Sequence, residues 1–183
     1  MKEKKSKPPQ QISQLKTESK LFTQGVPHVK HFSCGAPALD TYLQEQAHKY
    51  QQKGDGVTTL VVDCDRDQLV GYYTLTASSI SLIKGQKMLP AISIDMFAIN
   101  NCYRNTVIEE YDILVSDYIL GGLIGEIFRL SQEVLGIKFI TLHSVSWAVG
   151  FYGRNGFEEI SEDILPNDEY TEGCTPMFQK LYD

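Results

Sequence analysis

The stretch that decides the fold is Lys138–Phe157, which reads KFITLHSVSWAVGFYGRNGF. Its first part, Lys138–Val145, is rich in Phe, Ile, Leu and Val and contains no Gly or Pro, a composition typical of a buried strand. Ser146 is then expected to cap a short helix with apolar residues at three- and four-residue spacing. Asn155-Gly156 supplies a left-handed stop before a new strand at Phe157. The stretch predicts a strand, a helix and a second strand.

The helix and turn carry a pattern that can be compared with known families. Ala148 is followed by Phe151-Tyr152 and then by Gly156-Phe157. This pattern resembles the GNAT superfamily of N-acetyltransferases, whose members have an alanine, a Phe-Tyr pair and a Gly-Phe pair at this spacing. A second likeness lies at Phe32–Gly35, which resembles the start of the bacterial GNAT branch that includes the toxins of toxin–antitoxin pairs. Taken without the family, Lys138–Phe157 fits an amphipathic helix with core aromatics in any α/β protein.

Composition is that of an ordinary soluble globular protein. The chain has 183 residues, of which 42% are hydrophobic and 22% charged, and this length suits one domain with a substantial core. It contains no run of about 18 apolar residues. The lysines, prolines and glutamines at the N-terminus lack the apolar core of a signal peptide. We therefore expect a cytoplasmic protein with no membrane segment.

Charge is distributed unevenly along the chain. Residues 1–20 contain six lysines and two glutamates, a net charge of +4, whereas residues 21–183 carry −10. Because few apolar residues lie in residues 1–20, we expect a mobile basic tail there and a single domain over 21–183. The acidic body favours a small-molecule or peptide amine as the acceptor and disfavours tRNA, since phosphate binding needs clustered Lys and Arg.

The sequence shows no ligand pattern for a metal. Of the four histidines, only His28 and His31 lie near each other. The four cysteines are widely separated and lack the paired spacing of zinc or redox motifs: Cys34, Cys64, Cys102 and Cys174. Reduced thiols and no metal site are therefore expected.

Hydrophobic patterns predict the remaining elements. A helix is expected to open at Pro37 and to end at Gly54–Gly56, with Asp40 on its solvated side. Ser78–Leu89 is expected to be a connection. Three further runs predict strands, the first two joined as a hairpin: Thr58–Asp63, Leu69–Ala77 and Ala91–Asn100.

A long helix is predicted from Ser116 to Gly136, about 30 Å in length. In the GNAT family, glycines before this helix let backbone amides close on the pyrophosphate of the cofactor. Here Arg104 matches the first position of that motif, but Val107 and Glu109 stand where the glycines should be. The loop Asn105–Val115 is longer than usual, and the free amides around Ser116 offer another anion site.

The resemblance implies a GNAT fold of the α+β (mixed α/β) class. Such a fold has a central, mostly antiparallel sheet of six to seven strands, splayed between strands four and five and flanked by about four helices. Acetyl-CoA, as co-substrate, would enter at the splay. The fourth strand would pair with its pantetheine arm through the backbone of Phe97, Ala98 and Ile99.

The resemblance also assigns roles to side chains. Tyr152 would be the general acid that protonates the departing thiolate, since its ordinary pKa of about 10 keeps it protonated at neutral pH. Phe151 would pack near the cofactor, and a backbone N–H near Ile99 would polarise the thioester carbonyl. Arg154 would meet a phosphate or lie solvated at a helix end. The other expected cofactor-binding residues are Arg104, Asn105 and Ser116.

The general base and the acceptor stay open at this level. Asp95 and His143 lie on the two strands nearest the expected site and would act through water or have structural roles. The first hypothesis is acetylation of a small or peptide amine, and the second is toxin-like acetylation of aminoacyl-tRNA. The third is a GNAT-fold binding module without catalysis, suggested by the acids Glu109, Glu110 and Asp112. A homodimer and an antitoxin partner are also left open.

Overall fold

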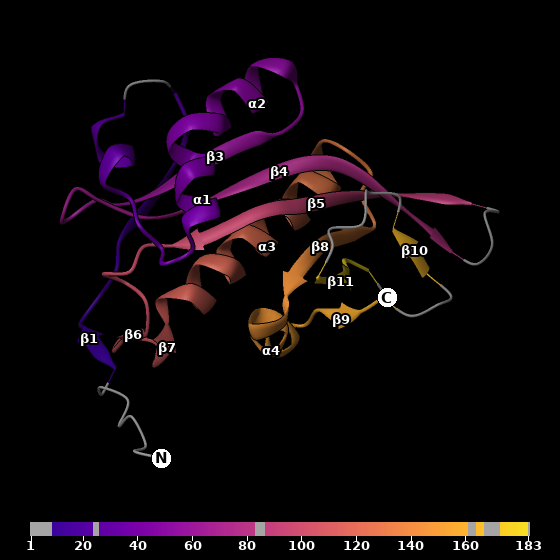
Figure 1. Ribbon diagram of the computed structural model, residues 1–183. Coiled ribbons are helices and arrows are strands. Elements are labelled where there is room, and N and C mark those ends of the chain that lie inside the picture. The colour runs from indigo at the N-terminus through magenta and orange to yellow at the C-terminus, as the bar shows by residue number, and fades with distance from the viewer. Residues whose placement is uncertain (1–8, 24–25, 83–86, 161–163, 167–172, 183) are drawn as a thin grey trace, which may run out of the picture.

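One large sheet organises the computed structural model, which describes residues 9–23, 26–82, 87–160, 164–166 and 173–182. Its strands follow the order β2-β3-β4-β5-β8-β11-β9, and β10 pairs with the far end of β4 (Figure 1). The strands span Thr17–Leu21 (β2), Val57–Asp63 (β3), Gln68–Leu82 (β4), Met88–Ile99 (β5), Phe139–Val145 (β8), Glu158–Glu159 (β9), Ile164–Pro166 (β10) and Cys174–Lys180 (β11). A second, small sheet has the order β1-β6-β7, formed by Gln10–Ile12, Thr106–Ile108 and Ile113–Leu114.

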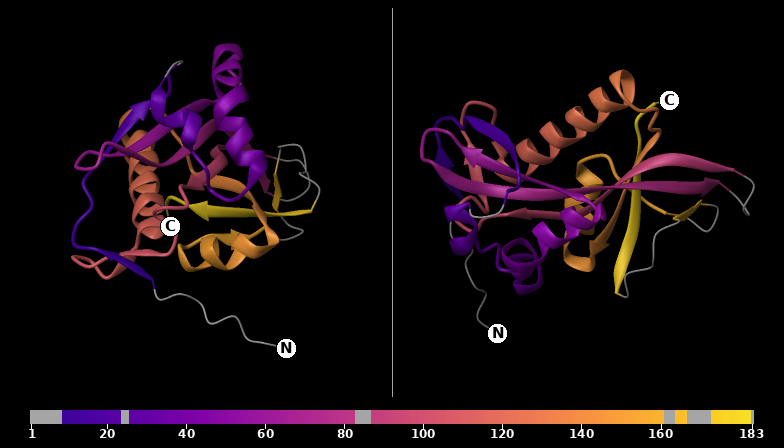
Figure 2. Two further views of the ribbon diagram at one scale, coloured as in Figure 1. Left: turned by 60° about the vertical axis from the view of Figure 1, so that its left-hand side comes forward. Right: turned by 90° about the horizontal axis from the view of Figure 1, so that it is seen from above.

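Helices cover both faces of the large sheet (Figures 1 and 2). On one face lies a continuous helical segment made of α1 (Pro37–Thr41), a π-helical turn (Tyr42–Gln46) and α2 (Ala47–Lys53). On the other face lie α3 (Val115–Glu133) and α4 (Val149–Arg154). The described chain therefore has three helical segments beside the expected mixed α+β sheet, one fewer than the family pattern predicts. Two 3-10 turns, Pro27–His31 and Ser146–Ala148, complete the helical structure of these residues.

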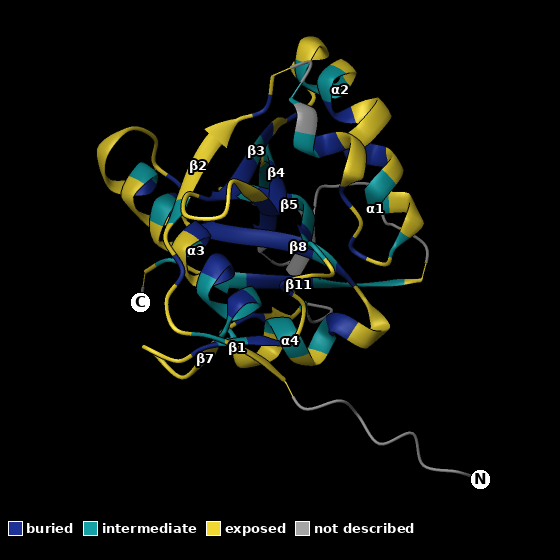
Figure 3. Ribbon diagram, turned by 90° about the vertical axis from the view of Figure 1, so that its left-hand side faces the viewer, coloured by how far each residue is buried: buried dark blue, intermediate teal, exposed yellow. Residues whose placement is uncertain are grey.

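The core consists of two layers, one on each face of the sheet. α3 buries a stripe at helical spacing against the sheet and leaves its outer side exposed, as Figure 3 shows. The buried residues of the stripe are Val115, Ile119, Leu120, Leu123, Ile127 and Ser131. The opposite layer packs α1 and the π-helical turn on Tyr72 and Ala98. β5 contributes to both layers, which explains why its sequence is apolar almost throughout.

A bulge in β5 produces the opening of the sheet. β4 and β5 pair as Leu75 with Ile94 and Thr74 with Met96, so Asp95 is the extra residue in the ladder. A bulge bends its strand and increases its twist. On the other side of β5, parallel pairing with β8 covers only three residue pairs and ends at Ser93 with Thr141. The splay predicted between these two strands is therefore present.

The N-terminal region differs from the expected tail. Residues 10–12 pair with β6, and residues 17–21 form the edge strand β2 along β3. Leu15, between them, is buried in the core. These strands are polar because an edge strand is held through its backbone and leaves most of its side chains in solvent. The first eight residues lie outside the described part of the chain.

Other segments also differ from the sequence expectations. Ser78–Leu89 belongs largely to β4 and β5, which form a hairpin projecting beyond the body (Figure 2, right), and residues 83–86 lie outside the described part. The long loop after β5 contains the β6–β7 hairpin. Ser146 begins a 3-10 turn instead of capping the helix, and the N-cap of α4 is Ala148, which makes no side-chain capping bond. The left-handed stop is confirmed at Gly156, whose φ is +88°.

Candidate active site

A cavity of about 220 Å³ lies where the sheet opens, and it gathers side chains from five separate segments. All nine residues expected at the site line it: Phe97, Ala98, Ile99, Arg104, Asn105, Ser116, Phe151, Tyr152 and Arg154. Six further residues complete the lining, of which the sequence analysis assigned none: Cys34, Ala36, Leu39, Leu114, Trp147 and Ala148. The volume suits the acyl end of a ligand and its neighbouring groups, with the rest extending to solvent.

The backbone of β5 offers unpaired groups to this cavity. Asn100 donates its N–H to Val70 on β4 at 2.8 Å. Because N–H and C=O groups alternate in direction along a strand, those of Ala98 also point to β4, and those of Phe97 and Ile99 point the opposite way. β8 has left the ladder before this point. The amides of Phe97 and Ile99 therefore face the splay, where an amide-bearing chain could pair with them.

Tyr152 presents a hydroxyl that makes no hydrogen bond with any other described residue. Its ring packs edge-on against Phe151 and Phe157, at centroid distances of 4.9 and 5.7 Å, and Phe151 stacks on Phe97 at 5.9 Å. Burial of the ring raises the pKa of Tyr152 above its ordinary value. The phenol stays protonated throughout the physiological range and can act as a proton donor.

Arg154 is held by a carboxylate. Its Nε and Nη2 donate to Oδ1 and Oδ2 of Asp117 at 3.0 and 3.1 Å, and its guanidinium lies 4.9 Å from the centre of the Phe151 ring. Asn155 Nδ2 also donates to Asp117 Oδ1, at 2.7 Å. Burial alone would raise the pKa of Asp117, but hydrogen bonds from Arg154 and Asn155 hold it below its usual range. The bidentate pair fastens α4 to the first turn of α3.

The N-terminus of α3 opens onto the cavity through Leu114 and Ser116. Leu114 is the N-cap and makes no side-chain capping bond, so the first amides of the helix remain available to an anion. The three acids of the preceding loop do not line the cavity: Glu109, Glu110 and Asp112. Glu109 instead donates its N–H to Ile12 in β1, because the β6–β7 hairpin carries this part of the loop away. These acids therefore repel an anion at the cavity less strongly than their place in the sequence suggests.

Two candidate bases lie on the strands that flank the splay. Asp95 occupies the bulge and accepts a hydrogen bond from the Thr76 hydroxyl. His143 lies two residues beyond Thr141, the last residue of β8 that pairs with β5, and its Nε2 is buried without a partner among the described residues. Neither lines the cavity that holds Tyr152. The structure therefore gives Asp95 a structural partner and leaves the role of His143 open.

The far side of the cavity is formed by the loop that leads into α1. Cys34 N–H and Ser33 Oγ donate to the carboxylate of Asp40 at 2.8 and 3.0 Å, so Asp40 fixes this loop instead of being merely solvated. Burial, together with the hydrogen bond to Asp40, raises the pKa of the Cys34 thiol to about 11. The thiol is therefore a neutral, apolar part of the wall at neutral pH.

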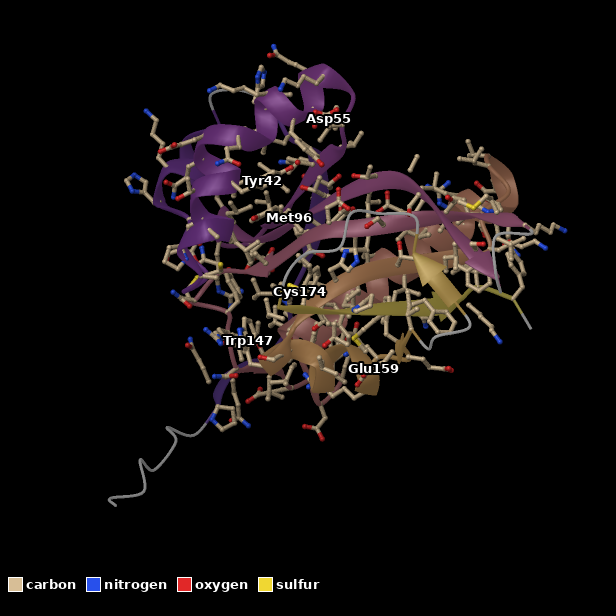
Figure 4. All side chains as sticks on the ribbon, turned by 45° about the vertical axis from the view of Figure 1, so that its right-hand side comes forward. Tyr42, Asp55, Met96, Trp147, Glu159 and Cys174 are labelled. Carbon is tan, nitrogen blue, oxygen red and sulfur yellow. The ribbon has the colours of Figure 1, made fainter. Side chains whose placement is uncertain are left out.

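Trp147 is the main residue that the sequence analysis missed. Its side chain is 71% exposed at the edge of the cavity, and Arg104 lies over its ring at 5.8 Å from the centroid. Figure 4 shows Trp147 near the gap between the α1–α2 segment and the orange C-terminal half, along which Met96 and Cys174 also lie. The available signal was a lone tryptophan beside Ala148, one position before the helical motif.

A larger hollow of about 450 Å³ lies elsewhere, between α3 and the β2–β3 edge. Two of its ionisable groups are engaged with each other, since Tyr73 donates to Glu126 Oε2 at 2.8 Å. It contains no residue of the motifs at Phe32–Gly35 or Ala148–Phe157. We therefore place the candidate site in the smaller cavity.

Within the described ranges, His, Cys, Asp and Glu side chains do not gather in groups of three or more that could hold a metal ion. None of the helices in these ranges has both the length and the apolar character needed to cross a bilayer.

Solved structures share this fold over nearly the whole chain. A structure described as a bacterial toxin matches with a TM-score of 0.71 and 21% identity, over 91% of this chain and 92% of that one. A tyrosine-to-phenylalanine variant of the toxin AtaT, bound to the C-terminus of the antitoxin AtaR and to acetyl-CoA, matches with a TM-score of 0.67 and 16% identity, over 90% and 93%.

AtaT complexed with acetyl-methionyl-tRNAfMet matches with a TM-score of 0.63 and 17% identity, over 82% of this chain and 94% of that one. No protein-family model and no curated protein matches the sequence. The predicted resemblance to the toxin-type branch is confirmed at the level of the fold.

Proposed function

We propose that this chain is an acetyl-CoA-dependent N-acetyltransferase of the GNAT toxin type, which acetylates the amino group of an aminoacyl-tRNA. The observation that carries this proposal is the cavity at the splay, which Phe97 and Ile99 of β5 line together with Tyr152 of α4. The fold shared with a toxin bound to acetyl-CoA, and with a toxin bound to an acetylated tRNA, supports the cofactor and the acceptor class.

The cavity suits acetyl-CoA in three respects. An extended amide-bearing arm would pair with the outward backbone groups of Phe97 and Ile99. Phosphate oxygens would meet the free amides before and at Ser116. When bound, acetyl-CoA supplies a thioester whose carbonyl carbon accepts the amine. The open N-terminus of α3 would thus bind the pyrophosphate in place of the missing glycines.

The reaction is a direct transfer between two bound substrates. The amine nitrogen forms a bond to the thioester carbon while the carbon–sulfur bond breaks. The N–H of Ile99 would stabilise negative charge on the carbonyl oxygen, and Tyr152 would donate its proton to the departing sulfur. The amine would lose its proton to water or to a base, for which His143 is a candidate on β8, one of the two strands that flank the splay.

The charge distribution favours a second candidate, a small cationic amine. Residues 21–183 carry −10, which opposes a polyanion at long range. The residues at the cavity favour aminoacyl-tRNA instead, because Arg104 and Arg154 line it and none of the three loop acids does. The experiment must therefore compare both acceptor classes.

The test measures CoA release with charged tRNA, uncharged tRNA and a panel of small amines. We expect release with charged tRNA, and we expect Tyr152→Phe to lower kcat by about 100- to 10,000-fold without changing acetyl-CoA affinity. Tyr111→Phe is the matched control, since Tyr111 is exposed and outside the cavity. Release with small amines alone would select the second candidate. A folded protein that binds no acetyl-CoA would refute both and leave a binding module without catalysis.

A further inference from the structure

Two cationic side chains line the cavity, but they lie at different ends of it. Arg154 is joined to Asp117 on α3. Arg104 packs on the opposite loop: a Cβ added to Gly35 would lie 3.2 Å from Arg104 Nη1. Of the two, only Arg104 has no carboxylate partner among the described residues. One end of the cavity thus holds an unpaired guanidinium.

Trp147 lies at that same end. Its ring is beneath the Arg104 guanidinium at 5.8 Å and is 71% exposed. An exposed indole beside an unpaired guanidinium offers a flat apolar surface and a positive charge within reach of one another. Nucleotides present the matching pair, a π-face and a phosphate, and single-stranded nucleic acid is commonly bound by such aromatic platforms.

Trp147 and Arg104 lie away from the α3 N-terminus, although the sequence analysis expected Arg104 to bind the cofactor. Ser116 and the α3 N-terminus lie beside Arg154 and Asp117. Arg104 and Trp147 lie toward the loop before α1, whose Ala36 and Leu39 also line the cavity. A ligand reaching Tyr152 from the Trp147 end would therefore approach from the side away from the α3 N-terminus.

We propose that Trp147 and Arg104 form a platform for the unpaired 3′-terminal nucleotide of the RNA acceptor. Trp147 stacks on the terminal base, and Arg104 pairs with the adjacent phosphate. This inference rests on the proposed function, because it assumes that an aminoacyl group at the RNA 3′ end enters the cavity. It makes the pair a determinant of acceptor specificity, whereas Tyr152 acts on the bond that breaks.

The chain contains a single tryptophan, so its intrinsic fluorescence reports on Trp147 directly. Uncharged tRNA added to the full chain is expected to quench this fluorescence, and tRNA shortened at its 3′ end is expected to quench it much less. Trp147→Phe removes the signal and confirms its source. Full quenching by acetyl-CoA alone, with no further change on adding tRNA, would overturn the proposal, because the platform would then hold the adenine of the cofactor.

Kinetics provide the second readout. Trp147→Ala is expected to raise KM for aminoacyl-tRNA by about 5- to 150-fold, the equivalent of one lost base stack, while KM for acetyl-CoA stays at the wild-type value. Trp147→Phe is expected to retain most of the affinity. Arg104→Gln is expected to reduce the slope of log Kd for tRNA against log salt by about 0.7, as for one phosphate contact with a single strand.

Failure of this inference differs from failure of the proposed function. If the wild type acetylates aminoacyl-tRNA and the Trp147→Ala variant shows an unchanged KM for it, the platform is refuted and the function stands. If the wild type binds no acetyl-CoA, the proposed function is refuted, while quenching by intact but not shortened tRNA still tests the platform by itself.

Discussion

Tyr152 is partly buried among its aromatic neighbours, and this loss of solvent raises its pKa. The raised pKa means that the protonated form persists above the ordinary tyrosine value of about 10. If Tyr152 is the acid, kcat should show no descending limb up to pH 10. A stopped assay over pH 7–10 with saturating substrates measures this, with folding followed by circular dichroism. A descending limb near pH 8 or 9 that disappears in Tyr152→Phe would show that Tyr152 titrates there, and it would contradict the raised pKa.

Asp117 illustrates how one carboxylate positions two helices. Asp117→Asn removes the charge that Arg154 and Asn155 share, and it should lower the free energy of unfolding by about 1 kcal/mol, since the pair is partly exposed. It should also raise KM for acetyl-CoA, because α4 and the α3 terminus lose their fixed relation.

Glu133→Gln is the control for Asp117→Asn. Glu133 pairs with Arg129 on the same helix, but both side chains are more than half exposed. It should change neither quantity measurably. Equal effects of the two substitutions in denaturant titrations would show that the Asp117 pair has no special role.

Glycines in β4 and α3 have different surroundings, so replacing them by alanine should change the stability of the protein in opposite directions. A Cβ on Gly71 would lie 2.4 Å from the backbone oxygen of Ala98, at the end of the β4–β5 ladder where Gly71 pairs with Ile99. Gly71→Ala should therefore destabilise by about 1–3 kcal/mol and lower kcat by displacing Ile99. Gly125 in α3 meets nothing within 4 Å, so Gly125→Ala should stabilise by about 1 kcal/mol. Urea unfolding compares them, and a shared sign would refute the packing argument.

The elements that sequence reasoning found are those with their own hydrophobic signal. β8, α4 and α3 follow directly from apolar periodicity, and the motif around Ala148–Phe157 contains residues that line the cavity. β1, β2 and β6 were missed because their stability comes from backbone pairing with distant strands, which leaves little trace in side-chain pattern. Trp147 was missed because exposure is a property of the folded surface. In the sequence alone, an isolated aromatic residue is equally consistent with a position in the hydrophobic core.

At the scale of the whole molecule, Asp63 joins three parts of the chain. It lies at the end of β3 with its side chain fully buried, paired with Arg66 in the turn at 2.8 Å and accepting a hydrogen bond from Tyr103 after β5, also at 2.8 Å. Burial alone would raise its pKa, but hydrogen bonds from Arg66, Tyr103 and two backbone amides hold the pKa below the usual range.

This lowered pKa predicts a pH-dependent contribution to stability. The contribution is complete above the unfolded-state value of about 3.9 and declines as pH falls through the lower folded-state value. Asp63→Asn should cost about 2 kcal/mol at neutral pH, and the difference from wild type should shrink below about pH 4. Chemical denaturation at pH 7 and at pH 3.5 measures this. A difference that is constant between the two would rule out the charged form as its source.

The short parallel pairing of β5 with β8 has a consequence for the folding of the chain. The β3–β4–β5 meander closes through local turns, whereas β5 meets β8 only after the crossover through α3 has formed. Loop-closure entropy makes such a contact slow compared with hairpins. We therefore expect the binding opening to arise late during refolding. Ligand binding during refolding would therefore measure when the contact between β5 and β8 forms, after most of the secondary structure has already formed.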